Sequence, residues 1–146
     1  MLKSYIEIDN SLSLLIKLIK NDTTIKILAE KLNTSQSNLY HKFSRGIVFY
    51  KDLYNILICI NKSLILKIIN KESLEEECLE TPTPNELIVF IKKKLVDKSL
   101  TQTDLAKYLN LSKSSLSQKF ARESLRITDL EKIFNFLNHN VILILK

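Results

Sequence analysis

Glycine, histidine, cysteine and long apolar runs are scarce in this chain of 146 residues, and each shortage excludes a class of protein. The one glycine, Gly46, excludes the glycine-rich loops that bind nucleotide phosphates. Neither His41 nor His139 has a cysteine or a second histidine at metal-ligand spacing, so we expect no metal and no cofactor. Cys59 and Cys78 are too few for a disulfide framework, which favours a reducing cytoplasm.

The longest apolar stretches, Ile56–Ile60 and Val141–Leu145 among them, have five residues each. A helix that crosses a membrane needs about 20, and the first residues lack the features of a signal peptide. The serines, aspartates and histidines form no nucleophile-and-base arrangement. We therefore expect a cytoplasmic protein that does not contact membranes and is not an enzyme.

Charge is present in excess and is unevenly placed. The net charge of +6 favours an acidic partner such as nucleic acid. Five glutamates and no basic residue lie between Glu72 and Glu80, and Thr81-Pro82-Thr83-Pro84 follows. We interpret residues 71–84 as an acidic linker with a short helical turn over Ser73–Leu79. It is either a solvated loop or a segment that competes with DNA phosphates for the basic surface.

Two copies of one unit flank this linker, which divides the chain into domains at 1–70 and 85–146. A shift of 77 residues aligns Thr24–Ile68 with Thr101–Leu145 without a gap. Identical pairs include Leu28/Leu105, Ala29/Ala106, Asn33/Asn110, Ser35/Ser112, Leu39/Leu116, Lys42/Lys119, Arg45/Arg122, Asp52/Asp129 and Leu66/Leu143. So many identities in one register predict a duplication.

Apolar periodicity and capping residues predict four helices and a terminal strand in each copy, hence a mainly α fold. In the first copy the predicted elements are Asp9–Lys20, Thr24–Leu32, Ser35–Ser44, Lys51–Ile60 and the strand Ser63–Ile69. In the second they are Asn85–Val96, a helix capped by Thr101, Lys113–Ala121, a helix capped by Thr128 and the strand Val141–Leu145. Because a lone strand seeks a partner, we expect the two strands to pair antiparallel. Pairing within one chain would make a pseudo-dimer with a pseudo-two-fold axis, and pairing between chains would make a homodimer.

The segment from Thr101 to Gln118 resembles the helix-turn-helix of Cro/CI-type (XRE-type) transcriptional regulators. Its Thr-Gln helix start, its Leu-Ala pair, its Leu-Asn before the turn and its Ser-capped recognition helix carry the resemblance. Ile27–Leu39 is similar, although Ile25 stands where the family often has Gln. The resemblance implies two tandem lambda-repressor-like helix-turn-helix domains that bind double-stranded DNA.

The outward side chains of the two recognition helices are the candidates for DNA contact. We expect the base-reading residues to be Gln36, Ser37, Tyr40, His41, Lys113, Ser114, Ser117 and Gln118. We expect the phosphate-contacting residues to be Ser35, Asn38, Lys42, Arg45, Gln102, Ser112, Ser115, Lys119 and Arg122. The two sets of base-reading residues differ, so we expect two unlike half-sites in an asymmetric DNA site.

These features predict a sequence-specific transcriptional regulator, with a repressor of a phage or mobile element as the specific expectation. The composition, rich in lysine, isoleucine and asparagine, is typical of low-GC bacterial genomes and their phages. The alternative is a protein-binding module on the same fold, such as a phage-encoded, anti-CRISPR-like inhibitor of a host nucleoprotein complex that also represses its own gene. A simple DNA mimic is disfavoured because mimics are acidic and this chain is basic.

Overall fold

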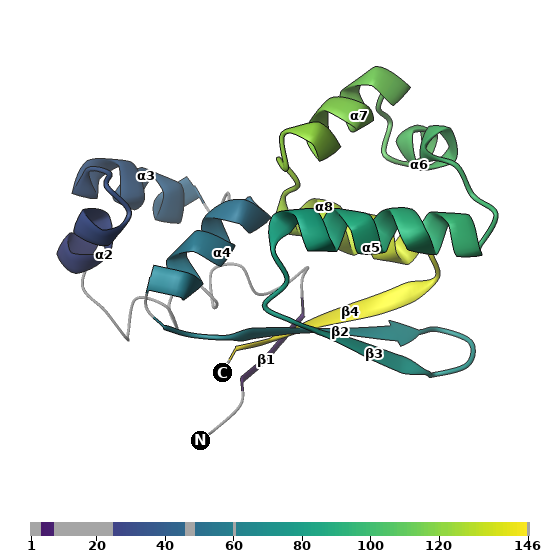
Figure 1. Ribbon diagram of the computed structural model, residues 1–146, viewed down its shortest axis with the longest axis horizontal. Coiled ribbons are helices and arrows are strands. Elements are labelled where there is room, and N and C mark those ends of the chain that lie inside the picture. Colours follow the sequence, from purple (N-terminus) through teal and green to yellow (C-terminus); the bar gives the residue numbers. More distant parts are fainter. Residues whose placement is uncertain (1–3, 8–24, 46–48, 60, 146) are drawn as a thin grey trace.

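The computed structural model describes residues 4–7, 25–45, 49–59 and 61–145, which form a mainly helical protein with one antiparallel sheet (Figure 1). The helices are α2 (Ile25–Lys31), α3 (Gln36–Arg45), α4 (Tyr50–Cys59), α5 (Pro84–Asp97), α6 (Gln102–Tyr108), α7 (Lys113–Ala121) and α8 (Ile127–Phe136). The strands are β1 (Ser4–Glu7), β2 (Leu64–Asn70), β3 (Glu76–Glu80) and β4 (His139–Leu145). The predicted helix Asp9–Lys20 lies outside the described residues.

The helices repeat with the spacing that the sequence predicts. The bounds of α2 and α4 become those of α6 and α8 when 77 is added, and α3 and α7 begin at equivalent residues. Most predicted bounds differ from the observed ones by one or two residues, and β4 begins at His139 and not at Val141. The predicted cap at Thr128 is wrong, because α8 begins at Ile127. The Asp129 carboxylate accepts the Arg126 backbone N–H at 2.9 Å, which fixes the helix start nearer to the amino terminus.

The described helices end in a common way despite the scarcity of glycine. Six of them are followed by a residue with positive φ: Asn33, Asn61, Ser99, Asn110, Glu123 and Asn138. After α6, Leu111 N–H donates to Ala106 O at 2.8 Å and Asn110 N–H donates to Lys107 O at 3.1 Å. This is the Schellman pattern, in which asparagine replaces glycine because its short polar side chain tolerates the left-handed region.

The sheet joins the two repeats, with its strands in the order β1-β4-β2-β3. The predicted antiparallel pairing of the two terminal strands is confirmed, and it occurs within one chain. Each terminal strand also has a second neighbour: β4 pairs with β1 of the first repeat, and β2 pairs with β3, which the acidic segment between the repeats forms. Both terminal strands are therefore interior strands, with no free edge left to pair with a second chain.

The strand register is the one that a two-fold axis between the repeats requires. Leu66 faces Leu143, and these two residues are equivalent under the 77-residue shift. A second equivalent pair, Phe49 and Arg126, forms an isolated antiparallel bridge, with the Arg126 guanidinium 5.7 Å from the Phe49 ring centroid. In each of these two pairs, a residue faces its own equivalent from the other repeat. A two-fold axis must pass between the partners of both pairs, so the repeats are related by a pseudo-two-fold axis.

The acidic segment differs from its prediction. It forms no helical turn over Ser73–Leu79 but instead turns back after β2 and continues as β3. Consecutive residues of a strand point to opposite faces. Glu76 therefore reaches Lys67 on one face at 3.2 Å, while Glu77 pairs with Lys94 of α5 on the other. These two lysines stabilise β3, although the glutamate-rich composition of the segment does not by itself predict a strand.

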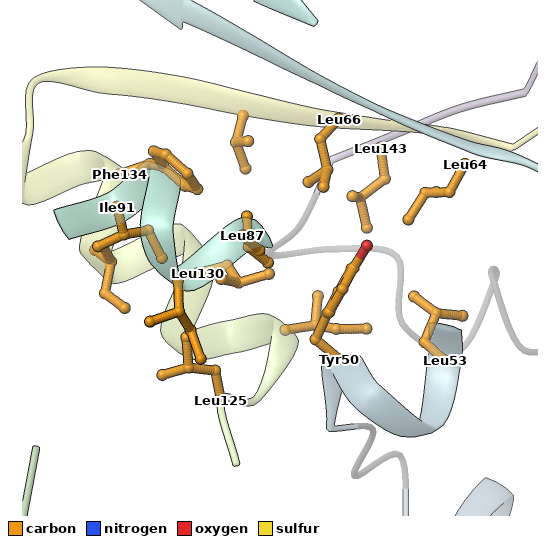
Figure 2. Close-up of a cluster of buried hydrophobic side chains, with 14 of the residues drawn as sticks. Tyr50, Leu53, Leu64, Leu66, Leu87, Ile91, Leu125, Leu130, Phe134 and Leu143 are labelled. Atoms are coloured by element: carbon orange, nitrogen blue, oxygen red, sulfur yellow. The ribbon is translucent and has the colours of Figure 1, made fainter. Parts of the chain in front are cut away.

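Buried side chains of both repeats form one continuous core between the sheet and the helices. Figure 2 shows Leu66 and Leu143 side by side, facing Leu87 and Phe134 of the second repeat. Tyr50 of α4 extends toward the sheet, where its Oη donates to Pro82 O at 2.6 Å. Burial raises the pKa of Tyr50, so its hydroxyl stays protonated as a donor. The core therefore continues across the repeat boundary.

Candidate nucleic-acid interface

The pair α6 and α7 is held by reciprocal caps and a short connection. Thr101 Oγ1 accepts the Asp104 N–H at 3.1 Å, and the Asp104 carboxylate accepts the Thr101 N–H at 2.9 Å. The bonds that the Asp104 carboxylate accepts from the Thr101 N–H and hydroxyl lower the pKa of Asp104, because they favour its charged form. Ser112 Oγ accepts the Ser115 N–H at 3.0 Å and starts α7. The beginning of each helix is thus specified locally by the sequence.

The pair α2 and α3 repeats this geometry in the first repeat. Thr34 N–H donates to Ala29 O at 3.0 Å, as Leu111 N–H does to Ala106 O in the second. Ser35 Oγ accepts the Asn38 N–H at 3.1 Å. The residues that pack between the two helices of each pair are buried in both repeats. They are Leu28, Ala29 and Leu39 in the first repeat, and Leu105, Ala106 and Leu116 in the second. Because the alanines are small, the two helices of each pair can pack closely.

The eight predicted base-reading residues are all exposed. They occupy positions one, two, five and six of α3 (Gln36, Ser37, Tyr40 and His41) and of α7 (Lys113, Ser114, Ser117 and Gln118). Residues with this spacing share one face of a helix. In Figure 1 the two helix pairs lie at opposite ends of the molecule, and both stand away from the sheet.

The predicted phosphate-contacting residues fall into two groups. Ser35, Ser112, Asn38, Ser115 and Arg122 are exposed, whereas Gln102 is half-buried at the first residue of α6. Lys42 and Lys119 instead make equivalent ion pairs, with Asp52 and Asp129, and both measure 3.4 Å. These pairs join each outer helix to the next helix and give both lysines a structural contact. The Arg45 side chain lies outside the described part of the chain.

A basic residue outside the predicted set lies close to this surface. The run Lys92-Lys93-Lys94 points in three directions from α5. Lys94 pairs with Glu77 of β3, and Lys93 lines a hollow next to Glu80 and Glu86. Lys92 lies over the Phe120 ring of α7, with its Nζ 5.5 Å from the ring centroid. The helical spacing of the run separates these directions, but only the structure shows which lysine faces α7.

Lys92 also lines a hollow of about 760 Å³ between α5, α6 and α7. The predicted DNA contacts Gln102 and Ser117 line the same hollow, and Glu123 borders it with a carboxylate. The surface formed by the exposed residues of α7 therefore extends across the hollow to α5. An amine, an amide and a hydroxyl are all donors that suit a phosphate oxygen.

Other site types receive no support from the described residues. In these residues, no three side chains of the His, Cys, Asp or Glu type gather closely enough to hold a metal ion. None of the described helices combines the length and apolar character that crossing a bilayer requires. Cys59 and Cys78 are both free thiols.

Comparison of the chain with protein-family models, with curated proteins and with solved structures gave no match. The assignment of the two helix pairs therefore rests on their residues and on their geometry. The most informative part of that geometry is its repetition, since caps, connections, buried anchors and ion pairs recur at equivalent positions.

Proposed function

We propose that the protein is a sequence-specific, double-stranded DNA-binding transcriptional regulator. Its recognition helices are α3 and α7, each the outer helix of a helix-turn-helix unit of the lambda-repressor-like type. The observation that carries the proposal is the recurrence of one helix-pair geometry with different exposed side chains. A protein that recognises two different half-sites needs the same helix-pair geometry twice, with different side chains at the positions that contact bases.

The chemistry of the exposed residues suits the major groove, which is about 12 Å wide and admits a helix. Gln36 presents an amide that can pair bidentately with adenine, and Lys113 presents donors for guanine O6 and N7. Lys92, Gln102 and Arg122 supply phosphate contacts around α7, which add affinity and salt dependence but no sequence choice. A regulator that acts by occupying its site would be a repressor, and the lysine-, isoleucine- and asparagine-rich composition fits a low-GC phage or mobile element.

The distribution of acidic residues is compatible with this role. The glutamates of β3 lie at the sheet, on the opposite side of the molecule from α7 (Figure 1). Glu76 and Glu77 form ion pairs there with Lys67 and Lys94. The acidic segment therefore leaves the surface around α7 open to an anionic partner.

Selection from a random duplex library at two salt concentrations tests the proposal. We expect enrichment of one asymmetric site, with half-sites about 34 Å apart if they lie one helical turn from each other. Gln36→Ala should relax one half-site and Lys113→Ala the other, each at a cost of about 1–3 kcal/mol in binding free energy. A perfectly palindromic site would contradict unlike half-sites, and uniform binding without enrichment would contradict sequence recognition.

The lysine run of α5 provides a matched pair of variants for the phosphate contacts. Lys92→Gln should reduce the slope of log affinity against log salt concentration by about one, which corresponds to the loss of one phosphate contact. Lys93→Gln should leave this slope nearly unchanged. Both variants remove one charge from adjacent positions of the same helix, so a general charge effect would weaken binding equally in both. Equal slopes for the two variants would remove Lys92 from the interface.

A further inference from the structure

Among the described residues, no strand pairs with the outer edge of β3, because β3 is the last strand in the sheet order. Thr81 N–H donates to Leu64 O, and Asn70 N–H donates to Glu75 O, so these pairs are of the hydrogen-bonded type. Antiparallel ladders alternate between hydrogen-bonded and non-bonded pairs. The backbone groups of Glu77 and Leu79 therefore face β2. Those of Glu76, Cys78 and Glu80 face away from the sheet.

An apolar hollow opens beside this edge. It has a volume of about 370 Å³ and lies between β3 and α5. Its apolar lining comes from Leu79, Pro82, Val89 and Phe90. Val89 is 55% exposed although it belongs to the helix that packs on the sheet. Leu79 pairs with the buried Leu66, so its side chain lies on the helix side of the sheet.

We propose that β3 and this hollow form a docking site for an extended segment of another protein. The segment adds a fifth strand at the free edge, where it bonds the outward N–H and C=O groups of Glu76, Cys78 and Glu80. Its residue opposite Leu79 lies on the helix side of the extended sheet, so an apolar side chain there enters the hollow. Strand addition thus fills the hollow and occupies the edge at once.

Charge selects a basic segment as the occupant. The residues of the added strand opposite Glu76 and Glu80 lie on the outer face, beside these carboxylates. Glu80, Glu86 and Lys93 also border the hollow, so its charged lining is acidic on balance. Lysine or arginine at the two outward positions, with an apolar residue between them opposite Leu79, gives the complementary pattern. Nucleic acid is excluded at this edge by its own negative charge.

A second copy of the chain does not fit the same edge. Antiparallel pairing of two β3 strands about Cys78 would place Glu76 of one copy against Glu80 of the other. Like charges directly opposite each other on a sheet are destabilising. The edge is therefore guarded against self-association, yet it remains open to a segment of opposite charge.

The docking site and the proposed DNA surface lie on different sides of α5, although Asn85 and Val89 line both hollows. The docking site lies at the sheet, whereas α7 stands on the other side of the molecule (Figure 1). A partner bound at β3 would leave the exposed residues of α7 uncovered. The inference does not depend on the proposed function, because its test does not involve DNA.

Two short synthetic peptides serve as probes, one that alternates lysine with leucine and one that alternates glutamate with leucine. The net charge of +6 opposes non-specific attraction of the lysine peptide, so its binding requires the local acidic edge. Amide hydrogen exchange of the full chain, followed by NMR, provides the readout. We expect the lysine peptide to slow exchange of the Glu76, Cys78 and Glu80 amides at least tenfold, and the glutamate peptide to have no effect. The Glu77 and Leu79 amides already bond to β2 and should change little.

Variants separate strand addition from charge attraction. Cys78→Pro removes an outward N–H without removing a bond to β2, and it should lower the affinity for the lysine peptide at least tenfold. Val89→Lys places a charge in the hollow and should do the same, whereas Val96→Lys, on the same helix outside the hollow, should not. This valine pair decides the outcome if Cys78→Pro fails to fold. Equal binding of both peptides, or lysine-peptide binding that survives Val89→Lys, would overturn the proposal.

Discussion

His139 illustrates how burial changes the chemistry of one side chain. It begins β4, is 7% exposed, and its Nδ1 lies 2.7 Å from Leu137 O. Burial lowers its pKa, and the nearby Lys98 and Lys94 lower it further, while the bond to Leu137 O and the Glu77 carboxylate act in the opposite direction. The folded protein therefore holds this imidazole neutral to a lower pH than the unfolded chain does.

This difference predicts acid sensitivity. An unfolded histidine takes up its proton near pH 6.5, so below that value the unfolded state binds more protons than the folded state. The free energy of unfolding should fall as the pH drops from 7.5 through 6.5, until the folded histidine is also protonated. Denaturant titrations across this range measure it. His139→Asn should flatten this part of the profile, and a variant with an unchanged slope would contradict the assignment.

The helix ends show how a chain with one glycine still makes left-handed turns. Five of the six positive-φ residues that follow helices are asparagine or serine, and Glu123 after α7 is the exception. Ser124 N–H donates to Lys119 O at 2.9 Å and Glu123 N–H to Phe120 O at 3.2 Å, so the Schellman pattern persists. In the sequence, Glu123 is equivalent to Gly46, the one glycine of the chain.

Glu123→Gly should therefore stabilise the protein. A side chain with a Cβ costs about 1–2 kcal/mol in the left-handed region, and glycine avoids that cost while gaining some unfolded-state entropy. We expect a net gain of up to about 1 kcal/mol in the free energy of unfolding, measured by thermal or urea denaturation. Asn110→Gly is the matched control, since asparagine already tolerates this conformation, and it should change stability much less. A loss of stability in Glu123→Gly would indicate that the carboxylate makes a needed contact.

The whole molecule is organised around the axis that passes between Leu66 and Leu143. Both side chains are almost fully buried, at 0% and 1% exposed, and they lie in the one core that both repeats share. In addition, β1 of the first repeat pairs with β4, the last strand of the second repeat. The repeats are thus interlocked and depend on each other for stability.

Leu66→Ala and Leu143→Ala should each lower the free energy of unfolding by about 2–5 kcal/mol, as expected for a cavity in a core. Because the two residues face each other, the double variant should deviate from additivity by about 0.5–3 kcal/mol. Urea denaturation measures all three values, and hydrogen exchange in α4 and α8 should accelerate together in each variant. Faster exchange in one helix alone would show that the repeats unfold independently.

Local features of the fold were predictable, whereas long-range pairings were only partly so. Caps such as Thr101 and Ser112, with apolar periodicity, placed α6 and α7 within a residue or two. The antiparallel pairing of the terminal strands followed from the repeat, but its register about Leu66 depends on packing that no local pattern encodes. β3 was missed because its glutamates resemble a solvated loop until Lys67 and Lys94 are placed beside them. In the sequence, the run Lys92-Lys93-Lys94 indicates a solvated helix face, with phosphate contact as the alternative, and which of its lysines faces α7 depends on where that helix lies.

The joining of both halves in one chain has a consequence for how the protein responds to its own abundance. A homodimer separates on dilution, so its occupancy of a site varies with the square of the subunit concentration at low levels. Here β2 and β4 are paired within one chain, and dilution cannot part them. Under the proposed function, operator occupancy would follow a simple hyperbola in protein concentration. Expression of the target gene would then decline gradually, without the threshold that dimer assembly imposes.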